Sequence, residues 1–155
     1  MDIWEEEARL ARTLGAIAVA DVIAGTLLVA TAGRRSPVAK GIGRQAVGWG
    51  LVNGAIAGVA EFRRRKEYEE HPSPQAAYCV GPRAARLRRM MTFNCGLDVV
   101  YVGVGKVMAW RAPAGSVRRG DGVGIVLQGL MLGALDGSSL ARLTPEKRID
   151  RRLTG

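Results

Sequence analysis

Two stretches decide the fold: FNCGLDVVYVGVG at residues 93–105 and GDGVGIVLQGLMLGALDG at residues 120–137. Each belongs to an apolar segment long enough to be a membrane helix. Each also carries polar side chains near its middle, Asn94 and Asp98 in the first and Gln128 in the second. An aspartate at the centre of a membrane helix costs about 2.5 to 3.5 kcal/mol on insertion scales, so these groups need an explanation.

The same layout occurs in the first half of the chain. LGAIAVADVIAGTLLVATAG at residues 14–33 carries Asp21, and GWGLVNGAIAGVAEF at residues 48–62 carries Asn53. The chain therefore contains four apolar segments, each with an amide or a carboxyl side chain near its middle.

The distribution of charge favours a membrane protein over a soluble one. A content of 48% hydrophobic and 24% charged residues fits a soluble domain, so the average alone decides nothing. Charges are, however, nearly absent from the four apolar segments and crowded between them, as in proteins that cross a membrane several times. Glycines are also frequent in these segments, where membrane helices use small residues to pack closely.

The net charge of +9 raises the alternative of a nucleic-acid-binding protein. Lysine and arginine flank every apolar segment, however, where they anchor helices to anionic lipid headgroups. We therefore expect the lipid bilayer, and no nucleic acid, as a partner.

Residue types also limit the chemistry. Cys79 and Cys95 are isolated thiols and His71 is the single histidine, so a disulfide framework, a zinc site and a histidine-based catalytic triad are not expected. We expect no metal, no cofactor and no enzymatic activity.

These observations predict an all-α polytopic membrane protein with four transmembrane helices. The predicted organisation is a first helical hairpin with an amphipathic N-terminal lead-in (1–62), a basic cytoplasmic loop (63–89), a second helical hairpin (90–140) and a basic cytoplasmic tail (141–155). In the lead-in, Ile3, Trp4 and Leu10 are expected to rest on the membrane surface.

The two hairpins are predicted to be repeats. A shift of 77 residues places Asp21 on Asp98, and a shift of 75 places NGAIAGVAE (53–61) on QGLMLGALD (128–136). Because each unit has an even number of spans, the units are expected to be parallel repeats about an axis along the membrane normal.

Basic residues predict the orientation. The N-terminus, the central loop and the tail together hold 15 lysines and arginines, whereas the two short turns hold 7. By the positive-inside rule, both termini are expected on the cytoplasmic side of a multi-pass protein of a bacterial inner membrane.

Two glycine ladders predict close helix packing, within the chain or across a homo-oligomer. The ladder glycines are Gly50, Gly54 and Gly58, and then Gly129, Gly133 and Gly137.

The polar groups have three interpretations. As a solute or ion site, Asp21, Asn53, Asn94, Asp98 and Gln128 would converge at mid-depth. As structural groups they would form hydrogen bonds between helices, and as a third possibility they would act as catalytic acids or bases. Two further carboxylates near the helix ends, Glu61 and Asp136, are expected to be interfacial charges paired with arginines.

Three functions follow. The first is transport or permeation of a small ion, a proton or a polar solute, in a homo-oligomer. The second is an accessory or assembly subunit that docks onto a partner membrane protein through its glycine ladders. The third, an enzyme that modifies lipid or quinone, lacks every usual nucleophile arrangement.

The second half also resembles a known family. The pattern N-x-G-L-D-V-x-Y-x-x-x-G, a basic turn, and G-x-G-x-x-x-Q-G-x-x-L, within residues 94–132, is similar to a family of small bacterial four-helix membrane proteins known only as a domain of unknown function. The chain departs from that family where Leu-Asp-Gly at 135–137 replaces expected aromatic residues. The resemblance implies membrane residence and no particular chemistry.

Overall fold

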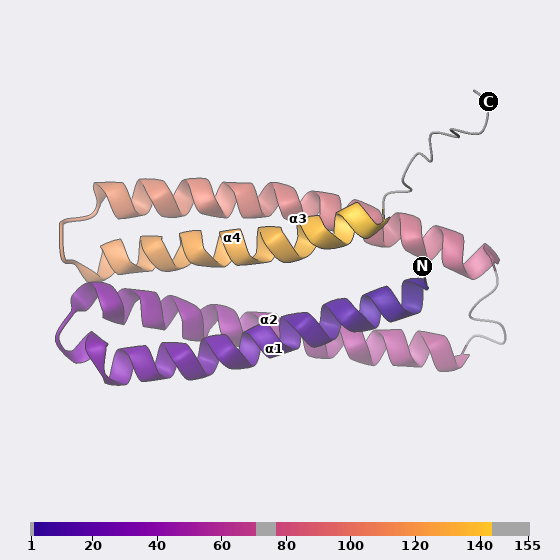
Figure 1. Cartoon of the computed structure of the whole chain (residues 1–155), viewed down its shortest axis with the longest axis horizontal. Coiled ribbons are helices and arrows are strands. Elements are labelled where there is room, and N and C mark those ends of the chain that lie inside the picture. The colour runs from indigo at the N-terminus through magenta and orange to yellow at the C-terminus, as the bar shows by residue number, and fades with distance from the viewer. Residues whose placement is uncertain (1, 71–76, 144–155) are drawn as a thin grey trace, which may run out of the picture.

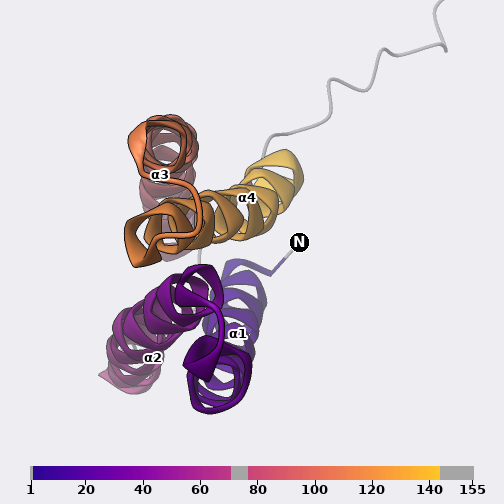
Figure 2. The same ribbon diagram turned by 90° about the vertical axis from the view of Figure 1, so that its left-hand side faces the viewer.

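The computed structural model describes residues 2–70 and 77–143, which form two helical hairpins lying side by side (Figure 1). The elements are α1 (Ile3–Ala30), the short 3₁₀ helix η1 (Ala32–Arg34), α2 (Pro37–Glu70), α3 (Ala77–Arg111) and α4 (Val117–Leu143). The prediction of an all-helical fold is confirmed. Figure 2, seen from the end that holds both hairpin turns, shows α3 and α4 above α1 and α2.

Most of the segment 63–89, which was predicted to be a loop, is helical. Helix α2 continues to Glu70 and α3 begins at Ala77, so only residues 71–76 of this segment lie outside the described part. Arginine and glutamate, which dominate the segment, are strong helix formers, and their charges pair between neighbouring turns. Most of the predicted tail, residues 144–155, lies outside the described residues.

Serine caps start both second helices in the same way. The Ser36 hydroxyl oxygen accepts a hydrogen bond from the Ala39 backbone N–H at 3.2 Å, and the Ser116 hydroxyl oxygen accepts one from the Arg119 N–H at 3.2 Å. Such caps satisfy N–H groups that lack a partner in the first turn of a helix. Each hairpin therefore turns at a defined residue.

The N-terminal turns of α1 are buried, and the prediction that Ile3 and Trp4 rest on a membrane surface is wrong. Both side chains pack with Leu87 and Met91 of α3 in the core cluster of the described residues. The Arg83 guanidinium lies 3.7 Å from the centroid of a Trp4 ring, an arrangement that attracts a cation to the aromatic face. The start of α1 thus joins the first hairpin to the second.

Ion pairs reinforce this junction, which we call the N-terminal clamp: residues Ile3, Trp4, Glu6 and Glu7 of α1 with their partners on α2, α3 and α4. Glu6 pairs with Arg9 at 2.6 Å and with Arg142 of α4 at 3.2 Å. The hydrogen bond from Arg9 holds the pKa of Glu6 below its ordinary value. Arg83 of α3 pairs with Glu7 at 2.6 Å and also with Glu67 of α2.

At the opposite end, α2 and α4 cross with their backbones in contact. A Cβ atom built on Gly120 would collide with the Val38 carbonyl, and one built on Gly41 would collide with the Val117 carbonyl. Because the obstacle is backbone in both cases, only glycine fits at this crossing.

Glycine pairs also join the helices within each hairpin. A Cβ on Gly25 would lie 2.6 Å from the Gly43 carbonyl oxygen, and a Cβ on Gly105 would lie 2.7 Å from the Gly122 carbonyl oxygen. These four glycines are outside the predicted ladders, although they make tighter contacts than most ladder members.

The ladders do not form continuous packing faces within the chain. Their first members are tight, since a Cβ on Gly50 would lie 2.8 Å from the Ala18 carbonyl oxygen and one on Gly129 would lie 3.0 Å from that of Asp98. The middle members, Gly54 and Gly133, have only ordinary contacts, at 3.6 and 3.5 Å. The last members, Gly58 and Gly137, have no atom within 4 Å of a built Cβ among the described residues.

These contacts correspond between the hairpins in a register different from the predicted one. Ala18 occupies the place against Gly50 that Asp98 occupies against Gly129. The offset is 80 residues between α1 and α3 (18 to 98) and 79 between α2 and α4 (50 to 129). Asp98 therefore corresponds to Ala18 rather than to Asp21, and the shifts of 77 and 75 do not describe the packing.

We expect Gly120→Ala to destabilise the protein and Gly137→Ala not to. The first adds a methyl group against the Val38 backbone, at an overpacking cost of roughly 1 to 3 kcal/mol. The second adds one to open space in a helix and should stabilise by up to about 1 kcal/mol. Thermal unfolding of the two purified variants checks this, and equal melting temperatures would contradict the crossing.

Candidate functional site

Away from the N-terminal clamp, the buried side chains of the bundle are small or polar, whereas many large apolar side chains are exposed. Asn53, Asp98 and Gln128 are 2%, 5% and 4% exposed, whereas Val99 and Leu51 are 73% and 64% exposed. Buried positions on α4 are glycines with Gln128, Asp136 and Ser139, and include no large apolar residue. Close glycine contacts leave little interior room for large side chains, which therefore point outward.

Five buried polar atoms have no hydrogen-bond partner among the described residues. They are Asp21 Oδ2, Asn53 Nδ2, Asp98 Oδ2, Asp121 Oδ1 and Gln128 Nε2. More than nine in ten buried polar groups in proteins are paired, and leaving one unpaired costs roughly 1 to 3 kcal/mol. Four of the five atoms belong to residues that the sequence predicted as a site.

Asp21 and Gln128 face each other across the two hairpins. The Gln128 side-chain amide is near enough to the Asp21 carboxylate to interact with it. The geometry is loose, however, because Asp21 Oδ2 and Gln128 Nε2 both remain without a partner. A hydrogen-bond donor or cation at the carboxylate oxygen and an acceptor at the amide N–H would complete both groups.

The corresponding pair on the other side of the bundle is aromatic. In the register of the packing, Tyr101 stands where Asp21 does and Trp49 where Gln128 does. The Trp49 and Tyr101 rings meet edge to face with centroids 5.2 Å apart. Of the two equivalent contacts between the hairpins, one is therefore made by aromatic rings and the other by polar side chains.

A second polar group lies within the α3/α4 hairpin. The Asp98 carboxyl group lies close enough to Asp136 for the two to interact electrostatically. Asn94 also interacts with the Asp136 carboxylate. The first hairpin has alanine at both corresponding carboxylate positions, Ala18 and Ala57. The two carboxylates are therefore not required by the packing.

The position of Asp136 contradicts the prediction made for it and adds a carboxylate to the predicted polar site. It was expected to be an interfacial charge paired with arginine, but it is 8% exposed and lies beside Asp98. For Glu61 the expected pairing with arginine is confirmed, since it pairs with Arg64 at 2.8 Å and Arg65 at 2.6 Å. Spacing could have revealed Asp136, because it follows Gln128 by two steps of four residues on one helix face.

The predicted residues form two groups rather than a single constellation. Asp21 interacts with Gln128, and Asp98 with Asp136 and Asn94. Asn53 is buried in α2 with its Nδ2 atom unpaired. Sequence analysis also missed Asp121, whose position at the start of α4 resembled an ordinary polar helix end.

The residue types restrict what these groups bind. Within residues 2–70 and 77–143, no cluster of three or more histidine, cysteine or carboxylate side chains is arranged to hold a metal ion. Carboxylate oxygens accept hydrogen bonds or bind cations, and amide nitrogens donate. Protons, monovalent cations, water and small hydroxyl-bearing solutes all suit this set.

The fold and the site define an all-helical protein with an apolar exterior, and two of its described helices, α1 and α4, are long and apolar enough to cross a membrane. In a soluble core helix such segments are mostly buried, whereas here only 11% and 28% of them are. The chain belongs to the Family of unknown function (DUF6992), which it matches over residues 13–137. No curated protein and no solved structure matches the chain.

The family match confirms the resemblance to an uncharacterised family and extends it. The resemblance rested on residues 94–132, whereas the match over 13–137 includes parts of all four helices. The matched region therefore includes parts of both hairpins.

We expect the double variant Asp98→Ala with Asp136→Ala to fold and to be at least as stable as the wild type. It gives the second hairpin the alanines that the first already has, and it removes a buried oxygen whose unpaired state costs roughly 1 to 3 kcal/mol. Thermal unfolding in detergent measures this. A large loss of stability would instead mean that the carboxylates hold the helices together.

Proposed function

We propose that this protein is an integral membrane protein that binds a proton or small cation at its buried carboxylates and carries it part or all of the way across the bilayer. The observation that supports this most directly is the set of unpaired buried atoms, above all Asp21 Oδ2 and Asp98 Oδ2, inside an apolar exterior. A small polar solute is the second ligand class that these groups suit.

Membrane residence is supported by the exposed surface. Large apolar side chains cover the outward faces of all four helices, among them Val19, Leu51, Val99 and Leu130. In water such a surface would cost about 25 cal/mol per Å², but in lipid it costs nothing. Helices α2 and α3 pack along α1 and α4, so four spans follow if α1 and α4 cross the bilayer.

The shared packing register supports two parallel repeats. Because α2 and α4 cross near their starts, both hairpin turns lie at one end, and the start of α1, the end of α2 and the start of α3 lie at the other (Figure 1). The end with more lysine and arginine is the cytoplasmic one by the positive-inside rule.

The charges of the site favour a cation or proton over a neutral solute. The groups that interact with Asp21 and Asp98 are an amide and another carboxylate, and no arginine or lysine is among them. Two carboxylates that interact in a low-dielectric interior cannot both be ionised cheaply. A bound proton or monovalent cation removes this cost.

Proton and sodium flux into liposomes tests the proposal. We compare the wild type with Asp21→Asn/Asp98→Asn, which keeps side-chain size but removes the groups that take up a proton or balance a cation. We expect flux to fall roughly tenfold or more, which corresponds to a barrier higher by about 1.4 kcal/mol. A membrane potential set by a potassium gradient drives protons or sodium ions into the liposomes. A dye trapped inside the liposomes reports the entry of the ion.

The matched control is Glu69→Gln, which removes one exposed carboxylate from the last turn of α2. It should keep wild-type flux. If the wild type carries neither ion, or if the double variant carries as much as the wild type with unchanged stability, the proposal is wrong.

A cysteine experiment tests the topology. In a Cys95→Ser background, Cys79 is the single thiol of the chain and belongs to the segment expected in the cytoplasm. We expect a membrane-impermeant maleimide to label it only after cells are permeabilised. Labelling of intact cells would place the 63–89 segment outside.

The second candidate function is an accessory subunit of a larger membrane complex. It is favoured by the open glycines Gly58 and Gly137, which have no neighbouring atom within 4 Å of a built Cβ. Such bare helix faces suit a second copy or a partner membrane protein. Absence of flux together with stable co-purification of a partner would favour this function.

A further inference from the structure

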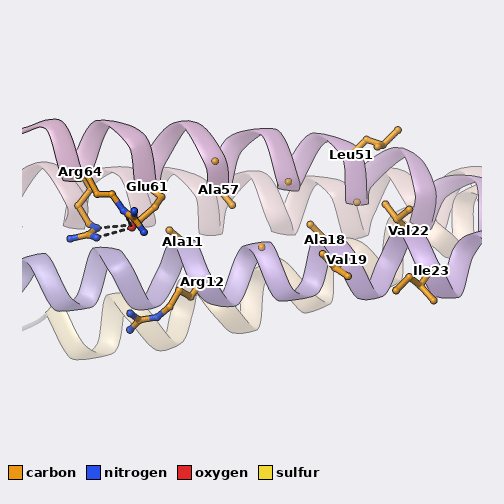
Figure 3. Close-up of a pocket in the computed structure, with 15 residues that line it drawn as sticks. Ala11, Arg12, Ala18, Val19, Val22, Ile23, Leu51, Ala57, Glu61 and Arg64 are labelled. Carbon is orange, nitrogen blue, oxygen red and sulfur yellow. Dashed lines mark hydrogen bonds and ion pairs between the residues drawn. The ribbon is translucent and has the colours of Figure 1, made fainter.

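A groove of about 780 Å³ runs along the outer face of the first hairpin, between α1 and α2 (Figure 3). Its floor consists of small residues that include Gly15, Ala18, Gly54 and Gly58. Val19 and Leu51 are among the apolar residues that line it. The polar site is separate from the groove, since none of Asp21, Asn53, Asp98 and Gln128 lines it.

The groove exists because α1 leaves α2 toward the N-terminal clamp. Near the turn the two helices touch through Gly25 and Gly43. Toward the other end, Gly15 has only Ala57 within 4 Å of a built Cβ, at 3.8 Å, and Gly58 has nothing. The clamp holds the start of α1 against α3 and α4, while Trp4 also meets Tyr68 near the end of α2 with ring centroids 5.2 Å apart. The groove therefore lies between two places where α1 and α2 are in contact.

The groove is basic at this open end. Arg12, Arg64 and Arg65 line it there together with the single carboxylate Glu61, as the labelled side chains of Figure 3 show for three of the four. Glu61 is already engaged by Arg64 and Arg65. Arg12 is exposed and forms no ion pair with any described residue. The open end of the groove therefore carries a net positive charge, next to the apolar part of the groove.

The length of the groove matches one leaflet of a bilayer. Along α1 it extends from Ala11 to Ile23, which is about 18 Å at 1.5 Å per residue. One leaflet contributes about 15 Å to the hydrocarbon core. An acyl chain that enters from the basic end fills the groove and stops at mid-membrane.

We propose that this groove binds an anionic glycerophospholipid, with its phosphate at Arg12 and the Arg64/Arg65 pair and an acyl chain along Gly15, Gly54 and Gly58. The assignment rests on the membrane residence proposed above, but not on ion transport. It uses the cytoplasmic leaflet, which is where anionic lipids attract basic residues.

Lipid retention after reconstitution tests this proposal. The full-length protein is incorporated into nanodiscs of equal parts phosphatidylglycerol and phosphatidylcholine, re-extracted in mild detergent, and its retained lipid is identified by native mass spectrometry. We expect phosphatidylglycerol to be retained in preference to phosphatidylcholine.

Two variants with matched controls locate the lipid. Arg12→Gln should lower the preference for phosphatidylglycerol roughly fivefold, the effect of about 1 kcal/mol per basic residue at an anionic surface. Arg118→Gln removes the same charge at the turn end and should have no effect. Gly58→Leu places a side chain in the groove at a position where a built Cβ has no described atom within 4 Å, and should abolish retention of either lipid. Gly137→Leu, at the corresponding open position of α4, should leave retention unchanged.

The outcomes that overturn the proposal are distinct from failure of the proposed function. Equal retention of the two lipids, or the same loss in Arg118→Gln as in Arg12→Gln, would overturn it even if the protein conducts ions. A change of oligomeric state in Gly58→Leu with lipid retention unchanged would assign the groove to a second copy and would also overturn it. Absence of ion flux leaves the lipid result intact.

Discussion

The crossing of α2 and α4 at Gly41 and Gly120 is the contact on which the arrangement of the bundle depends. Each glycine lies against the backbone of the opposite helix, so any side chain at either position would push the hairpins apart. Glycine contacts continue inside each hairpin and leave little interior volume. Along these contacts, large apolar residues such as Val99 therefore point outward and cover the outside of the bundle.

Because backbone contacts hold the helices, the neighbouring side chains are free to differ between the hairpins. The first hairpin has Ala18 where the second has Asp98, in the same contact with a glycine of the next helix. One inter-hairpin contact joins Trp49 and Tyr101, while its counterpart joins Gln128 and Asp21. At these corresponding positions the same backbone packing thus carries an apolar or aromatic residue in one hairpin and a polar residue in the other. The polar residues make up the candidate site.

The N-terminal clamp gives the bundle its second asymmetry. By packing Ile3 and Trp4 against α3, helix α1 departs from α2 and opens the groove on the outer face of the first hairpin. The inner polar site and the outer groove are therefore separate consequences of helix packing, one from the crossing of α2 with α4 and the other from the path of α1. The cation and the lipid proposed above would therefore occupy separate parts of the bundle.

The sequence by itself determined the helices, their order and most of the polar residues that matter. Apolar length and charge distribution suffice for this, because both act locally along the chain. Only the tertiary structure decided the register between the hairpins, which pairs Asp98 with Ala18 in place of Asp21. It also decided the burial of Asp136, because whether a helix position faces a neighbour depends on how closely the backbones approach, and that is fixed by glycines on both helices together.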